Sequence, residues 1–144
     1  MVKENIKYQA IFFDFDGVIL DSVHVKTEAF AEMFRKYGPE IEQAVIDHHL
    51  ANGGISRFHK IKHYYENILK KSITQEELQE LGDKFSKLVL QKVLNSPYIP
   101  GVLETLQKLK KNNVPCFVIS GTPEEEINFI VEKKELNTFF LEVH

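Results

Sequence analysis

The chain has 144 residues, of which 43% are hydrophobic and 27% are charged, and its formal net charge is −3. These values are typical of a soluble globular protein that forms one ordinary domain, or a small core with an accessory lobe. The small negative charge argues against nucleic-acid or membrane partners, and no segment approaches the roughly 20 apolar residues of a membrane span.

The first seven residues and the cysteine content both bear on location. Residues 1–7 contain no apolar stretch of the signal-peptide type. Cys116 is the only cysteine, so no intramolecular disulfide can form. We therefore expect a reducing, cytoplasmic environment.

The first predicted element is a strand over residues 8–13, which ends in a continuous apolar run and is followed soon by a glycine. Short runs of this kind are typical of strands that are buried on both faces of a parallel sheet.

Two aspartates follow this strand directly. Asp14 and Asp16 are two residues apart, so on an extended chain their carboxylates point to the same side. Aspartate is disfavoured in strands, and two carboxylates held together at the end of a buried strand repel each other. Such a pair suits the binding of a hard cation or shared acid and base work. The alternative interpretation is an Asx turn that ends the strand, or a calcium loop.

Residues 19–95 are predicted to be helical throughout. Helices are expected over residues 24–37, 41–50 and 56–69, and a fourth helix is expected to begin at the capping box of Thr74 and Glu77. This segment is therefore predicted to be a four-helix insertion after the first strand.

The chain then returns to alternating helix and strand. An amphipathic helix is predicted over residues 101–112, a second buried strand over 114–119, and a weaker third strand over 138–143. Strands that alternate with helices favour an α/β fold with a parallel sheet.

A hydroxyl and a glycine follow the second strand at Ser120 and Gly121. We expect Thr122 to cap the next helix, with Pro123 in its first turn and Glu125 completing a capping box. The Ser120 hydroxyl and the Gly121 N–H would then face a phosphate near a helix N-terminus. Taken alone, the same four residues also fit an ordinary strand-to-helix turn.

Together these segments resemble the haloacid dehalogenase superfamily. Residues 13–22 are similar to its first motif, Asp-x-Asp-Gly-Val-x-x-Asp-Ser, and residues 119–123 to its second. The helical insertion resembles the type-one cap of the phosphoglycolate-phosphatase and β-phosphoglucomutase-like branch. The resemblance implies a Rossmann-like core formed by residues 1–18 and 96–144, and a cap formed by residues 19–95.

The resemblance also implies chemical roles and a cofactor. Asp14 would be the nucleophile that forms an aspartyl-phosphate, and Asp16 the general acid and then base. Mg²⁺ would bind the Asp14 carboxylate and the Asp16 backbone carbonyl, and Ser120 would hold a phosphoryl oxygen. In the family, an acid at position 16 accompanies an oxygen leaving group, so the expected reaction is that of a phosphatase or a phosphomutase rather than a dehalogenase or phosphonatase.

The cap would supply substrate contacts. Residues 52–57 resemble the substrate-specificity loop of this branch, so Gly54 and Arg57 are expected near the substrate, with Arg57 meeting a second anionic group. An arginine at a helix start beside glycines is otherwise simply solvated. The expected partner is a small phosphorylated metabolite.

The sequence lacks the lysine and acidic motifs that follow a third strand in this family. The expected core is therefore truncated to about three strands, with impaired activity and weak metal binding. An inactive remnant that binds a phosphorylated ligand or a protein is the alternative. Without later strands the first strand becomes a sheet edge, which favours self-association.

Overall fold

The computed structural model describes residues 7–144, which form two compact units. One unit, the sheet-bearing unit, comprises the chain up to residue 21 together with residues 96–144, and the other, the helical unit, comprises residues 22–95. The remaining residues, 1–6, carry most of the expectation about a signal segment and lie outside the described part.

The chain first passes from the sheet-bearing unit to the helical unit after residue 21, three residues later than the predicted boundary between residues 18 and 19. Backbone hydrogen bonds explain the shift. Ile99 donates its N–H to the Ile19 carbonyl at 3.0 Å, and Asp21 donates its N–H to the Pro97 carbonyl at 2.9 Å. Residues 19–21 are thereby tied to the sheet-bearing unit.

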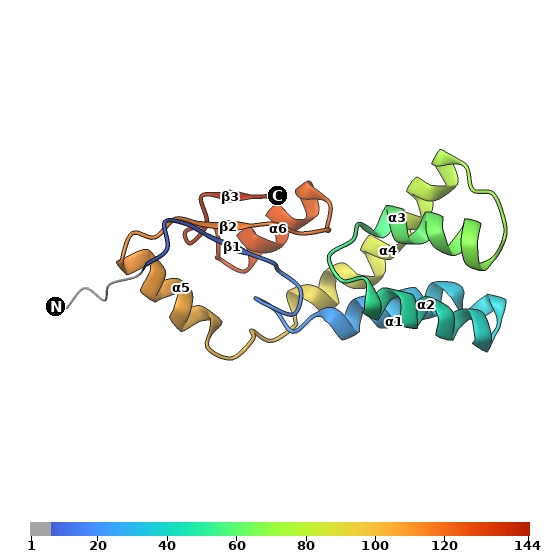
Figure 1. The fold of residues 1–144 in the computed structure, drawn as a ribbon, viewed down its shortest axis with the longest axis horizontal. Coiled ribbons are helices and arrows are strands. Elements are labelled where there is room, and N and C mark those ends of the chain that lie inside the picture. The colour runs from blue at the N-terminus through green and yellow to red at the C-terminus, as the bar shows by residue number, and fades with distance from the viewer. Residues whose placement is uncertain (1–6) are drawn as a thin grey trace. The chain divides into compact units, whose positions relative to one another are not determined.

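The sheet-bearing unit contains a parallel sheet of three strands in the order β1-β2-β3, with bounds Ile11–Phe13, Cys116–Val118 and Glu142–Val143 (Figure 1). Phe13 pairs with Val118, which in turn pairs with Val143. The predicted α/β class with a small parallel sheet is confirmed, although each strand is shorter than expected. Pro115 lacks an N–H, so β2 begins only at the residue after it.

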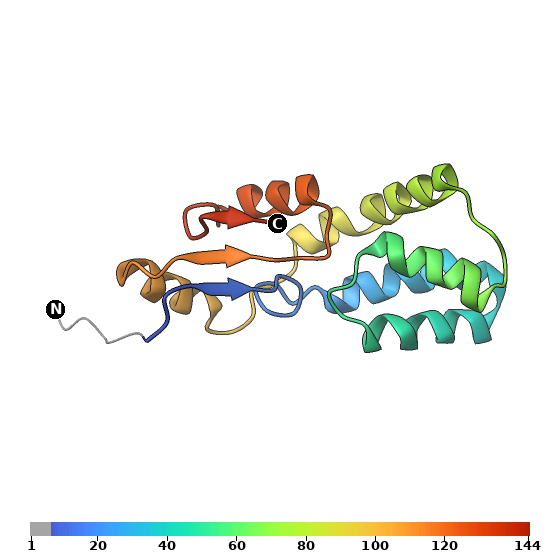
Figure 2. The ribbon, with the colours of Figure 1, turned by 45° about the horizontal axis from the view of Figure 1, so that its top comes forward.

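Two helices cover one face of this sheet, α5 (Val102–Lys111) and α6 (Glu124–Lys133). Figure 2 shows α5 behind β1 and β2, and α6 beside β3. Right-handed crossovers between parallel strands in the order β1-β2-β3 place successive helices on the same side, which accounts for this one-sided arrangement. The apolar side chains of Cys116 and Val118 are buried.

The start of α6 differs from the expectation. Pro123 occupies the N-cap position, the helix begins at Glu124, and no side chain caps it. The predicted cap at Thr122 is therefore wrong. Thr122 is buried, and its N–H donates to the Ser120 hydroxyl at 3.1 Å, so this residue belongs to a turn that precedes the helix.

The helical unit contains four α-helices, as predicted, and two short segments of other helical types. The α-helices are α1 (Val23–Phe34), α2 (Pro39–Ala51), α3 (Arg57–His63) and α4 (Gln75–Leu94). A 3₁₀ turn over Arg35–Tyr37 follows α1, and a π-helical segment over Tyr64–Ile68 follows α3. The predicted third helix thus ends in a wider turn, in which Leu69 donates its N–H to the Tyr64 carbonyl at 2.9 Å.

The predicted capping box at the start of α4 is present. Thr74 donates its N–H to Glu77 Oε2 at 2.8 Å, and Glu77 donates its N–H to Thr74 Oγ1 at 3.2 Å. Across residues 7–144, no helix is both long enough and apolar enough to cross a membrane.

Candidate active site

The candidate site begins where β1 ends, at Phe13. Asp14 is exposed and Asp16 is half-buried, whereas Phe15 between them has no exposed surface. The strand-like alternation therefore continues past β1 and directs both carboxylates away from the core. The Phe15 N–H donates to Asp14 Oδ1 at 2.7 Å, which fixes the orientation of this carboxylate and leaves its second oxygen for other contacts.

A tight turn over residues 16–20 holds the backbone that carries Asp16. Gly17 has φ of +77°, a left-handed conformation that glycine adopts readily, and it donates its N–H to the Leu20 carbonyl at 2.7 Å. Ile19 donates its N–H to the Phe15 carbonyl at 2.8 Å, and both Ile19 and Leu20 are fully buried. The backbone that carries Asp16 is thus anchored at both ends of the turn.

The end of β2 lies beside the end of β1. Phe13 and Val118 are register partners, and Ile119 donates its N–H to the Phe13 carbonyl at 2.8 Å. Asp14 and Ser120 follow this pair by one and two residues, so both lie at the carboxyl edge of the sheet. In open α/β sheets, ligands bind at that edge.

The Ser120 hydroxyl oxygen accepts the Thr122 N–H, but its own hydrogen can still be donated to a ligand. The Ser120 N–H donates to the His144 carbonyl at 2.6 Å. This backbone amide is therefore already engaged by the end of the third strand. Gly121 is half-buried in the same turn.

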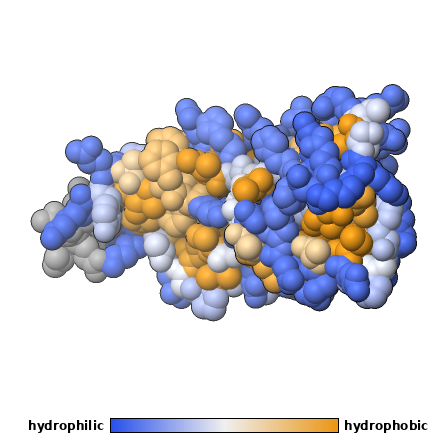
Figure 3. Space-filling model, turned by 45° about the vertical axis from the view of Figure 1, so that its right-hand side comes forward, coloured by the Kyte–Doolittle hydropathy of each residue, from blue (hydrophilic) through white to orange (hydrophobic). Residues whose placement is uncertain are grey.

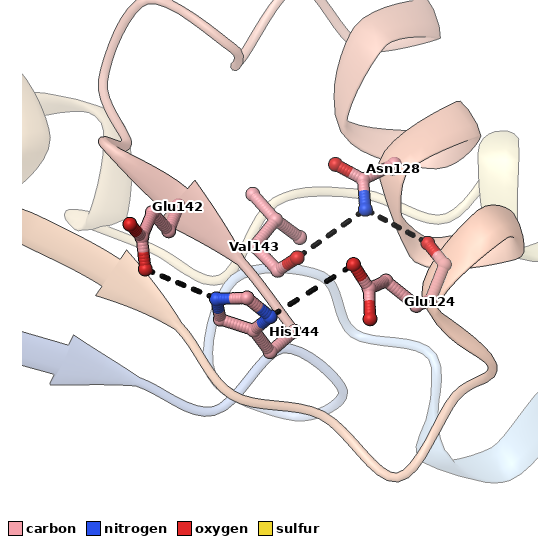
Figure 4. Close-up of polar contacts among 5 residues, drawn as sticks. All are labelled: Glu124, Asn128, Glu142, Val143 and His144. Atoms are coloured by element: carbon pink, nitrogen blue, oxygen red, sulfur yellow. Dashed lines mark hydrogen bonds and ion pairs between the residues drawn. The ribbon is translucent and has the colours of Figure 1, made fainter.

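A polar cluster at the end of β3 was not identified from the sequence. His144 Nε2 lies 3.1 Å from Glu142 Oε2, and its Nδ1 lies 3.9 Å from Glu124 Oε1 (Figure 4). Asn128 donates its side-chain N–H to the Glu124 and Val143 carbonyls at 2.9 and 3.2 Å. The hydrogen bond to Glu142, followed by the charge of Glu124, raises the pKa of His144.

This cluster connects α6, the end of β3 and the backbone of Ser120. It joins the first turn of α6 to the end of β3, and the His144 carbonyl holds the Ser120 backbone. The alternation Glu-Val-His in a strand is the only sequence signal for it, because it places the acid and the histidine on the same face.

Asp14 and Asp16 are the candidate metal ligands of this site. Within residues 7–144, no group of three or more histidine, cysteine, aspartate or glutamate side chains is placed to hold a metal ion. The two aspartates nevertheless supply hard oxygen donors, and Mg²⁺ is commonly bound through one or two carboxylates with water and substrate phosphate as further ligands. The donor chemistry at Asp14 and Asp16 therefore fits Mg²⁺.

Arg57 and Gly54 lie in the helical unit. The Arg57 side chain is buried, its Nη1 donates to the Ser86 hydroxyl, and its guanidinium lies 4.7 Å from the centre of the Phe85 ring. Gly54 is exposed with φ of +78°, and nothing lies within 4 Å of where a Cβ would be. Its glycine is thus required by backbone conformation rather than by close packing.

A second buried cation of the helical unit was also missed by the sequence interpretation. Lys60 is buried three residues after Arg57, and its Nζ lies 2.9 Å from His49 Nδ1. A lysine in a helix pattern of mixed polar residues gives no signal of burial, because lysine is rarely buried.

Comparison with known proteins places these features in context. The profile of the haloacid dehalogenase-like hydrolase family matches residues 8–144. A phosphonoacetaldehyde hydrolase from Pseudomonas putida is 24% identical over 142 residues, which covers 91% of this chain and 50% of the relative. A phosphoglycolate phosphatase from Pseudomonas savastanoi pv. phaseolicola is 30% identical over 131 residues, which covers 90% of this chain and 47% of the relative.

Solved structures show the same fold. A β-phosphoglucomutase from Clostridium difficile superposes with a TM-score of 0.71 at 22% identity, covering 94% of this chain and 60% of that one. The chain spans about half the length of the curated relatives that it matches.

Proposed function

The chain belongs to the haloacid dehalogenase-like hydrolase family, and from that membership we propose that it carries the nucleophile and the general acid of a Mg²⁺-dependent phosphatase acting on a small phosphate monoester. The observation that supports this most is the placement of Asp14 and Asp16 beyond β1, with Ser120 beyond the neighbouring strand.

The proposed reaction has two steps. A carboxylate oxygen of Asp14 attacks the phosphorus, the bond from phosphorus to the ester oxygen breaks, and Asp16 gives its proton to the departing alcohol. Asp16 then takes a proton from water as the water oxygen attacks the phosphorus of the aspartyl-phosphate. This step releases inorganic phosphate and regenerates the Asp14 carboxylate.

The orientation of each group suits its role. The Phe15 N–H holds one oxygen of Asp14, so the other is available for attack. The turn over residues 16–20 holds the backbone at Asp16. The Ser120 hydroxyl and the Gly121 N–H would donate to oxygens of the phosphoryl group.

Mg²⁺ would be held by the Asp14 carboxylate and the backbone carbonyl of Asp16. When bound, it offsets the repulsion between the aspartates and the phosphate and stabilises negative charge on the transferring group.

The substrate class follows from the leaving group. Relatives of this chain include phosphonoacetaldehyde hydrolases as well as phosphoglycolate phosphatases. Cleavage at an oxygen benefits from an acid that protonates the departing alcohol, and Asp16 can supply that proton. A phosphate monoester of a small metabolite, of the phosphoglycolate or sugar-phosphate type, is therefore the proposed substrate.

A phosphomutase is the second candidate, since the fold is shared with a β-phosphoglucomutase. In that reaction the phosphoryl group passes from Asp14 to a second substrate hydroxyl instead of water. The two outcomes are distinguished by whether inorganic phosphate is released.

Arg57 and Gly54 are retained as proposed contributors to substrate binding. Because Arg57 is bonded to Ser86 inside the helical unit, its substitution tests two roles. Arg57→Lys would raise KM if the guanidinium binds substrate, whereas a purely structural role would lower the stability of the helical unit and leave KM unchanged.

The decisive experiment uses acetyl phosphate with Mg²⁺ and follows the chain by intact-protein mass spectrometry. We expect one phosphoryl group to be added to the wild-type chain, and none to Asp14→Asn. Acetate is a weakly basic leaving group that needs little protonation, so Asp16→Asn is expected to become phosphorylated but to hydrolyse about 10²–10⁴-fold more slowly.

Asp47→Asn serves as the matched control, because Asp47 is an exposed aspartate of the helical unit. It should behave like the wild type. Phosphorylation that survives Asp14→Asn, or the absence of phosphorylation in both the wild type and Asp16→Asn, would contradict the proposal.

A further inference from the structure

The loop that follows α2 contains a chemically labile pair of residues. Asn52 is directly followed by Gly53. In such a pair the backbone nitrogen of the glycine can attack the side-chain amide of the asparagine, because glycine has no Cβ to obstruct the approach. The other asparagines all precede larger side chains: Asn5, Asn67, Asn95, Asn112, Asn113, Asn128 and Asn137. Asn52 is therefore the asparagine whose amide is most open to this attack.

The structure leaves the attacking nitrogen available. Among residues 7–144, the Gly53 N–H finds no hydrogen-bond acceptor. Gly53 and Gly54 are exposed, and nothing lies within 4 Å of where a Cβ of either residue would be. The backbone of this loop can therefore turn to bring the Gly53 nitrogen to the Asn52 side chain without displacing other groups.

The turn after β1 contains a similar pair that is held differently. Asp16 is the one aspartate followed by a glycine. Gly17 donates its N–H to the Leu20 carbonyl at 2.7 Å, and Ile19 and Leu20 are fully buried. The Gly17 nitrogen must lose this hydrogen bond before it can attack, and the buried side chains oppose that local opening. The fold thus protects the aspartate of the candidate site and leaves the asparagine of the helical unit open to attack.

We propose that Asn52 is a site of spontaneous deamidation in the folded chain, with water as the only co-reactant. The Gly53 nitrogen loses its proton and forms a bond to Asn52 Cγ, while Nδ2 takes up a proton and leaves as ammonia, which closes a succinimide ring. Water then adds to one of the two ring carbonyls, and the bond from that carbon to nitrogen breaks. The product is aspartate, or isoaspartate, in which the backbone runs through the side chain.

Water reaches this loop in the folded chain. Gly53 and Gly54 are exposed, and Asn52 is partly exposed. The surface in Figure 3 carries broad apolar areas as well as hydrophilic ones, whereas these three residues have no apolar side chain that would exclude water. Hydrolysis of the succinimide therefore requires no unfolding.

Conversion would change the end of α2. Asn52 is the C-cap residue of this helix, and its Nδ2 donates to the His48 carbonyl at 2.9 Å. A carboxylate cannot donate this hydrogen bond, and its negative charge is unfavourable at the C-terminal end of a helix. Isoaspartate also lengthens the backbone ahead of Ser56, whose hydroxyl accepts the Phe58 N–H at 3.3 Å at the start of α3. We therefore expect deamidation to lower the stability of the helical unit.

The test incubates the full chain at mildly alkaline pH, because the attacking nitrogen must lose its proton, and follows each asparagine by peptide mapping with mass spectrometry. We expect Asn52 to convert at least about tenfold faster than any other asparagine, which corresponds to a barrier lower by about 1.4 kcal/mol. Asp16 should stay intact in the folded chain. In guanidinium chloride, which releases the Gly17 N–H, Asp16 should isomerise faster than in the folded chain.

Gly53→Ala is the variant that isolates the chemistry. Gly53 lacks the left-handed φ of Gly54 and has room for a Cβ, so the variant should fold like the wild type by circular dichroism. It should slow the conversion of Asn52 by at least about tenfold, because the added Cβ obstructs the attacking nitrogen. Asn52→Asp supplies the product charge directly and should lower the midpoint of thermal unfolding; an unchanged midpoint would contradict the expected effect on α2.

The opposite results would overturn the proposal. These are an Asn52 that stays intact, an Asn52 that converts as fast in Gly53→Ala as in the wild type, or an Asp16 that isomerises as fast as Asn52 converts in the folded chain. None of them bears on phosphorylation of Asp14, and the inference does not depend on the proposed phosphatase reaction. Failure here is therefore distinguishable from failure of the proposed function.

Discussion

The helical unit and the sheet-bearing unit bury their apolar side chains in different ways. In the helical unit, Phe30 lies at the centre of an aromatic cluster drawn from several helices. Its ring centroid is 4.3 Å from that of Phe85, 5.5 Å from that of Tyr64 and 5.0 Å from that of His49. All four side chains are buried, so this core is closed on every side.

The sheet-bearing unit has a closed core on one face only. Val118, Leu106 and Ile127 are buried between the sheet and its helices. Phe12 on the opposite face stacks on Phe117 but stays largely exposed. The proposed catalytic residues Asp14 and Asp16 thus lie on the unit with the less complete core, and stability is expected to reside mainly in the other.

Truncating the two phenylalanines tests this comparison most directly. Phe30→Ala should lower the free energy of unfolding of the helical unit by about 3–5 kcal/mol, because it leaves a cavity in a fully packed cluster. Phe12→Ala should cost less than about 1 kcal/mol, since its ring already contacts water. Chemical denaturation followed by circular dichroism measures both.

Equal losses for the two variants would contradict the comparison, because they would mean that the sheet face around Phe12 is as well packed as the aromatic cluster. Phe129→Ala provides a control for removing a ring from a helix surface, since Phe129 is 40% exposed on α6.

The packing of α3 against α4 gives the next largest effect. Gly82 lies within α4, and a Cβ at this position would overlap the Phe58 ring, lying 2.8 Å from Cζ. Alanine normally stabilises a helix by about 1 kcal/mol relative to glycine. Overpacking typically costs about 1–3 kcal/mol, so Gly82→Ala should be destabilising by about 1 kcal/mol overall.

A double-mutant cycle with Phe58→Ala checks the cause. Once the ring is removed, the same glycine-to-alanine change should become stabilising. A loss that is unchanged in the Phe58→Ala background would show that the Phe58 ring is not responsible.

The sequence predicted the elements better than the loops that join them. The alternation of apolar runs and amphipathic helices specified the α/β class, because those periods reflect burial directly. The capping box of Thr74 and Glu77 was also predicted correctly. At Thr122 the same rule failed, because Pro123 takes the capping position. The Thr122 N–H, which a capping box would direct to the Glu125 side chain, donates instead to the Ser120 hydroxyl.

Some residues of the candidate site could be placed from the sequence, and others could not. Asp14 and Asp16 follow a strand, and a strand places its neighbours predictably. The burial of Arg57 and Lys60, and the joining of Glu124, Glu142 and His144, depend on contacts between elements distant in sequence. No local pattern encodes those contacts.

The capping box offers a test of similar size within the helical unit. Thr74→Ala removes the acceptor for the Glu77 N–H at the start of α4, and should cost about 1 kcal/mol. Thr27→Ala is the control, because the Thr27 hydroxyl is exposed and donates only to the Val23 carbonyl within α1. Thermal unfolding of both variants would show a lower midpoint for Thr74→Ala alone; equal midpoints would contradict a stabilising box.

The smallest expected effect is a pH dependence confined to the helical unit. The His48 ring stacks on His63 with centroids 4.2 Å apart, and its Nδ1 lies 3.4 Å from the Tyr64 hydroxyl. Burial lowers the pKa of His48 below its ordinary value of 6.5, and the positive charges of His63 and Lys60 lower it further.

The sign of the dependence follows from this lowered pKa. At a pH above 6.5, His48 is neutral in both states and its contribution to stability is fully present. As the pH falls through 6.5 toward the lower pKa of the folded state, the unfolded chain binds a proton that the folded chain resists, so the free energy of unfolding decreases.

His48→Gln should reduce this loss on acidification, whereas His59→Gln, at an exposed position on α3, should retain it. Denaturation midpoints measured across this range test the point. An equal acid-induced loss in wild-type and His48→Gln chains would mean that the stacked histidine pair does not make the closed aromatic core sensitive to protonation.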